Sequence, residues 1–79
     1  MIEVFRTNVR SRGHAKMLVA QIHREFSDYE ANFDLDDHDN ILRINSSTGA
    51  VQPSRLINFL KSFGFDAEVL PDECHILHK

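Results

Sequence analysis

Residues 29–45 read YEANFDLDDHDNILRIN, and this stretch decides the expected fold. Apolar side chains alternate with polar ones from Ala31 to Leu35, which is the pattern of a strand with one buried face. The cluster DDHDN is typical of a turn, and the alternation resumes after it with Leu42 and Ile44 on the core side. Two alternating runs around a polar turn predict a β-hairpin.

A strand and a helix are expected before this hairpin. Residues 2–9, IEVFRTNV, are mostly β-branched or aromatic and contain no breaker, so they predict a strand. Ser11 is a suitable residue for a helix N-cap. Apolar residues then recur at helical spacing as far as Phe26, which predicts an amphipathic helix.

A second helix and a last strand are expected after the hairpin. Pro53 suits the first turn of a helix, because the N–H that proline lacks has no partner there. Gly64 stands where a helix commonly ends. Residues 65–70, FDAEVL, alternate and predict a strand, which Pro71 ends. The order βαββαβ predicts an α+β, ferredoxin-like domain with a four-stranded antiparallel sheet and two helices on one face.

The bulk composition indicates one small domain of 79 residues with a formal net charge of -3. We expect residues 1–71 to form it and residues 72–79 to form a tail. The acidic balance argues against a nucleic acid or an anionic membrane as partner, because phosphate binding needs clustered basic residues. The single cysteine, Cys74, excludes an internal disulfide. No secretory signal pattern and no apolar run of about 18 residues is present, so the cytoplasm is the expected compartment.

Residues 64–69, GFDAEV, resemble the glycine–aromatic–x–Ala–x–Val ending that is common in heavy-metal-associated domains. The similarity in element spacing extends over residues 2–70. It implies the same fold and a first loop with the metal motif Met-x-Cys-x-x-Cys. Here Val9 stands in the place of the methionine, and Ser11 and His14 stand in the places of the cysteines.

The replaced motif changes the chemistry that is expected of the first loop. A soft ion such as Cu(I) needs thiolate or thioether ligands, so metal transfer by the family's usual mechanism is not expected. Arg10 and Arg12 repel a nearby cation, and with the free N–H groups of a helix start they suit an anion better. The alternative is that both arginines are solvated loop charges without a ligand.

Histidines offer a second interpretation, in which the chain binds zinc or nickel without thiolate pairs. In a βαββαβ domain the first loop and the acidic turn lie at the same end, so His14 and His38 could share a metal with a carboxylate. The turn carboxylates could instead serve turn geometry or pair with the loop arginines. A further set of suitable ligand types lies in the tail, at Cys74, His75 and His78.

Catalysis is not expected. Ser11 and His14 lack a third group, and an acylphosphatase-like use of a loop arginine with Asn45 lacks that family's phosphate-binding motif. A small-ligand regulatory module is a third hypothesis, but Gly13 is the only glycine in the first loop. We therefore expect a non-enzymatic interaction or regulatory module without a cofactor, whose partner is another protein or a second copy. Its expected contact surface is the end of the domain that carries the first loop or, alternatively, an exposed edge of the sheet. Its expected recognition residues are Val9, Arg10, Ser11, Arg12, His14 and Phe65.

Overall fold

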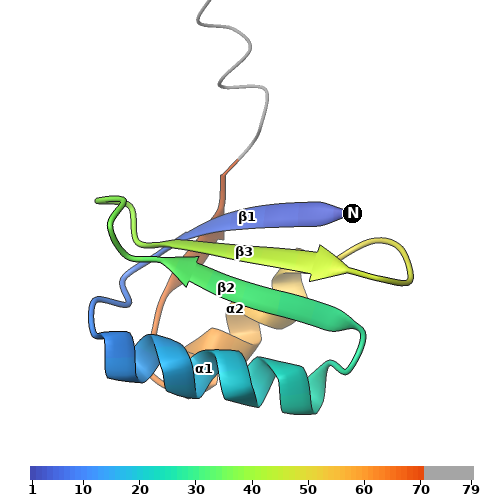
Figure 1. The fold of residues 1–79 in the computed structure, drawn as a ribbon, viewed down its shortest axis with the longest axis horizontal. Coiled ribbons are helices and arrows are strands. Elements are labelled where there is room, and N and C mark those ends of the chain that lie inside the picture. Colours follow the sequence, from blue (N-terminus) through green and yellow to red (C-terminus); the bar gives the residue numbers. More distant parts are fainter. Residues whose placement is uncertain (71–79) are drawn as a thin grey trace, which may run out of the picture.

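The computed structural model describes residues 1–70, and its elements follow the predicted order. They are β1 (Ile2–Thr7), α1 (Arg12–Glu25), β2 (Tyr29–Asp34), β3 (Ile41–Ser46), α2 (Pro53–Ser62) and β4 (Ala67–Val69). The strands form one antiparallel sheet in the order β2-β3-β1-β4, with both helices on the same face (Figure 1). The predicted ferredoxin-like fold is confirmed. The expected tail residues Cys74, His75 and His78 lie outside the described residues.

The hairpin of β2 and β3 forms in the predicted register. Ala31 pairs with Ile44 and Phe33 pairs with Leu42, so these four side chains point to the helices. Leu42 and Ile44 are fully buried. The strict period of two therefore fixes which face of the sheet becomes the core.

The acidic residues between β2 and β3 shape the turn. The Asp36 N–H donates to Asp34 Oδ1 at 3.3 Å, and the Asp39 N–H donates to Asp37 Oδ1 at 2.9 Å. Asn40 has a φ of 50°, a left-handed conformation that asparagine tolerates. Turn geometry, one of the interpretations open for the turn carboxylates, thus accounts for Asp37, and Asp34 at the end of β2 serves the turn in the same way.

Both helix starts agree with the sequence, but the last strand is shorter than expected. Ser11 caps α1, and Pro53 is the first residue of α2. After α2, Gly64 has a φ of 91°, and the Phe65 N–H donates to the Leu60 carbonyl at 3.1 Å. This is a Schellman turn, which uses the Phe65 backbone to close the helix. The predicted strand over residues 65–70 was therefore too long, and β4 begins only at Ala67.

Two groups of buried side chains support the domain. The main core lies between the sheet and both helices, while a smaller group of Val9, Ala15 and Leu18 lies under the start of α1. Phe33 and Phe65 pack against both groups. The first loop therefore rests on a small core of its own. The fully buried large residues of the main core are Phe5, Ile22, Leu42, Ile44, Leu56 and Leu60.

Candidate functional site

The first loop, the β2–β3 turn and the α2–β4 turn meet at one end of the domain, as predicted (Figure 1). The Thr7 N–H donates to the Asp39 carbonyl at 3.2 Å, which joins the loop to the acidic turn. The Asn8 N–H donates to the Asp66 carbonyl at 3.3 Å, and the Asp66 N–H donates to Asn8 Oδ1 at 2.8 Å. We call residues 8–14, 35–40 and 63–66 the first-loop end.

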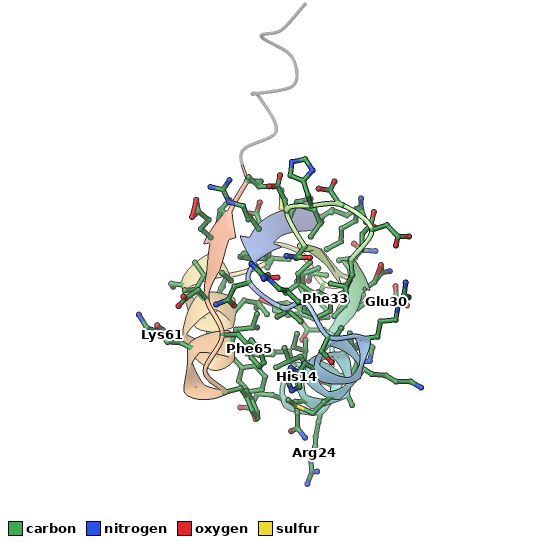
Figure 2. The ribbon with its side chains drawn as sticks, turned by 90° about the vertical axis from the view of Figure 1, so that its left-hand side faces the viewer. His14, Arg24, Glu30, Phe33, Lys61 and Phe65 are labelled. Carbon is green, nitrogen blue, oxygen red and sulfur yellow. The ribbon has the colours of Figure 1, made fainter. Side chains whose placement is uncertain are left out.

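Most of the expected recognition residues in the first loop have structural partners. Val9 has no exposed surface, and its N–H donates to Thr7 Oγ1 at 3.2 Å, so it supports the loop from beneath. Ser11 Oγ accepts from the His14 N–H at 3.3 Å, which is the N-cap bond of α1. The His14 ring packs against Phe65, with ring centroids 5.3 Å apart. Figure 2 shows the two residues side by side. These contacts hold Val9, Ser11 and His14 in place within the first loop.

The two loop arginines differ in their surroundings. Arg12 forms an ion pair with Asp36 of the acidic turn, with Nη2 and Oδ1 3.6 Å apart. Both side chains are more than four-fifths exposed, at 85% and 90%, so the pair adds little stability. Arg10 is exposed and makes no ion pair within residues 1–70. The expected pairing between the turn carboxylates and a loop arginine is therefore present for Arg12.

The predicted histidine site does not gain further ligands in the described part of the chain. Residues 1–70 contain no group of three or more His, Cys, Asp or Glu side chains that could hold a metal ion. His14 faces Phe65, and His38 is exposed in the β2–β3 turn. Asn45 lies opposite Ile2, at the other end of the sheet from the loop arginines, so the acylphosphatase-like set is not assembled.

Beside the first-loop end, a groove of about 360 Å³ separates α1 from β2. We call it the α1–β2 groove. Its apolar floor comes from residues of both elements, at Ala15, Val19, Ala31, Phe33 and Leu35. The polar lining has mixed charge, with Arg12 and Lys16 from α1 and with Asn32, Asp34 and Asp36 from β2 and the turn that follows it.

The groove runs along an edge of the sheet, because within residues 1–70 β2 pairs with β3 alone. In antiparallel pairing, every second residue of an edge strand points its N–H and C=O away from the partner strand. Ala31 is such a residue, because its N–H donates outward to His23 Nε2 of α1 at 3.0 Å. The backbone N–H and C=O of Phe33, two residues further along β2, also point away from β3. No partner for the Phe33 N–H is found within residues 1–70.

Sequence reasoning missed His23, Lys16 and Val19 as members of a site. It assigned the first two only to the polar side of the helix. The contact between His23 and β2 depends on how α1 lies on the sheet, which hydrophobic periodicity does not specify. The strand order of the fold, which places β2 at an edge, was the available signal.

Two ion pairs lie on the open face of the sheet. Arg6 Nη2 donates to Glu68 Oε2 at 2.8 Å, and this hydrogen bond, aided by the charge of Glu68, raises the pKa of Arg6. Arg43 lies 3.8 Å from Asp34 across β2 and β3. This face therefore presents paired charges, whereas the α1–β2 groove presents apolar surface and an open strand edge.

Comparison of the chain with models of protein families, with curated proteins and with solved structures gives no match. The resemblance to heavy-metal-associated domains stays a prediction from the element order and residues 64–69. Within residues 1–70, no helix has the length and apolar character that crossing a bilayer requires.

Proposed function

We propose that this chain is a non-catalytic protein-binding module that contacts its partner at the first-loop end and in the α1–β2 groove. The observation that carries the proposal is the groove, which combines an apolar floor, a rim of mixed charge and, within residues 1–70, a strand edge without a partner strand. Surfaces with these properties recur in domains that recognise segments of other proteins.

The first loop supports a structural role for the residues that replace the metal motif. A nucleophile needs a base within hydrogen-bonding reach, and Ser11 Oγ is instead the cap of α1. His14 contributes its backbone N–H to that cap and its ring to the contact with Phe65. These contacts favour a structural role for Ser11 and His14 at the boundary of the groove.

The expected order of importance within the recognition surface follows from exposure. Arg10, Arg12 and His14 are exposed and available to a partner, whereas Val9 is buried. Lys16 extends the same surface along α1, one helical turn beyond Arg12. A partner that lies across this surface therefore meets Arg10 and Lys16, the Arg12–Asp36 ion pair and the apolar floor of the groove.

Site-specific crosslinking tests the proposal. A photoreactive p-benzoylphenylalanine replaces Lys16 in the groove and, as a matched control, Lys61, which is exposed on α2 and lies away from His14 in Figure 2. In extract from the source cells, we expect discrete protein adducts from position 16 that unlabelled domain competes away, and none of these from position 61. The same adducts from both positions, or no discrete adduct from position 16, would contradict the proposal.

A further inference from the structure

The edge of β2 and the charge of Lys16 together indicate what kind of partner the groove binds. We propose that the α1–β2 groove accepts an extended segment of another protein, which adds to β2 as an antiparallel strand and directs apolar and acidic side chains towards α1. This inference rests on the proposed function and specifies what the groove binds.

The backbone of β2 limits where such a strand can pair. The outward N–H of Ala31 already donates to His23, so this position is occupied. The outward N–H and C=O of Phe33 lie next along the edge and can exchange two hydrogen bonds with an added residue. The added strand is therefore centred on Phe33 and ends near Ala31, where His23 stops it.

The floor of the groove fits side chains from alternate residues of an extended chain. Ala15 and Val19 lie on one helix face, at i and i+4, and Phe33 lies opposite them on β2. Alternate residues of a strand point to the same face at intervals of about 6.5–7 Å. One side chain of an added strand then rests on Val19, and the next on the same side reaches the first turns of α1.

The charge near that second position comes from Lys16. The groove lining carries two cations, Arg12 and Lys16, and two carboxylates, Asp34 and Asp36. Asp34 lies 3.8 Å from Arg43 and forms an ion pair with it. Arg12 already pairs with Asp36, but Lys16 has no ion pair within residues 1–70. An acidic side chain on the added strand would supply that counter-charge, which is why we assign acidic residues to the side facing α1.

A second copy of the chain fits the edge poorly. The residues of β2 that face the helices are Tyr29, Ala31 and Phe33, so a second β2 brings no carboxylate to Lys16.

The test uses two capped seven-residue peptides and the domain labelled with ¹⁵N. The first peptide is Thr-Val-Thr-Glu-Thr-Val-Thr, and the second has lysine in place of glutamate. We expect the glutamate peptide to bind about five- to tenfold more tightly, because the charge at Lys16 changes from an attraction to a repulsion. In the complex, the Phe33 amide should exchange with solvent more slowly than in the free domain. The variant Lys16→Glu should reverse the order of the two peptides.

Several results would overturn the inference. Equal affinity for both peptides would contradict the preference for an acidic residue facing α1. A Phe33 amide that stays unprotected in the complex would contradict the addition of a strand to β2. Binding of neither peptide at millimolar concentration, or dimerisation of the free domain with protection of Phe33, would also overturn it. If these occur while the crosslink at position 16 is retained, the protein-binding proposal stands and only the extended acidic segment is rejected.

Discussion

The two edges of the sheet are built differently. The β4 edge is three residues long, because the Schellman turn after α2 uses the chain up to Phe65. The β2 edge is six residues long and borders the α1–β2 groove, with the single side chain of His23 bonded to it at Ala31. Proteins protect edges by shortening or covering them. This domain closes one edge by length and leaves the other open at Phe33, so binding should be confined to the β2 side.

The largest expected effect comes from a substitution in the core, on the central strand β1. Phe5 is fully buried on β1 and pairs with Leu42 of β3 and Val69 of β4. Phe5→Ala should lower the free energy of unfolding by about 3–5 kcal/mol, through lost burial and the cavity that remains. Urea denaturation followed by circular dichroism measures this, and a spectrum that is unfolded without urea would agree with it.

The control for this substitution is Phe63→Ala, because Phe63 is 38% exposed at the end of α2. Its loss of stability should be much smaller. If Phe5→Ala costs less than about 1 kcal/mol, the central position of β1 between the two edges is wrong.

Features that depend on residues close together in the sequence could be predicted, whereas contacts between distant elements could not. The alternation around the hairpin, the cap at Ser11 and the glycine at Gly64 are local signals, and the structure confirms the elements they predict. The turn that shortens β4 is also local in sequence. It was not predicted because residues 65–70 alternate as a strand does. The His23 bond to Ala31 joins two elements through the docking of α1, so no local pattern contained it.

The groove wall should weaken when α1 loses its cap. Ser11→Ala removes the side-chain acceptor of the His14 N–H and should lower the free energy of unfolding by about 1 kcal/mol. Ser11→Asp is the matched control, since aspartate is an equally good N-cap and should keep nearly all of the stability. Urea denaturation of the three proteins decides, and equal stability of Ser11→Ala and the parent would contradict the assigned cap.

A smaller effect is expected when the shield of the β2 edge is removed. His23→Ala leaves the Ala31 N–H without its acceptor and should cost about 0.5–1.5 kcal/mol. His23→Gln offers a side-chain oxygen in its place and should recover part of this loss. Hydrogen exchange followed by NMR should show a faster Ala31 amide in His23→Ala than in His23→Gln. The same Ala31 rate in both variants would argue against a shielding role.

The smallest effect is expected at the β4 edge, which needs no shield. Glu68→Gln removes the carboxylate that pairs with the exposed Arg6. Because water and salt screen exposed ion pairs, Glu68→Gln should lower the urea midpoint less than His23→Ala does. The difference in midpoint between Glu68→Gln and the parent should vanish at high salt. A loss larger than that of His23→Ala, or one that persists at high salt, would mean that the β4 edge depends on this pair.

The most direct test of the central claim is hydrogen exchange of three neighbouring amides in the free, unmodified domain. Asn32 bonds to β3, Ala31 bonds to His23, and Phe33 points outward without a partner within residues 1–70. We expect slow exchange at Asn32, intermediate exchange at Ala31 and fast exchange at Phe33. Protection of Phe33 equal to that of Asn32 would show that the β2 edge is closed and would contradict the account.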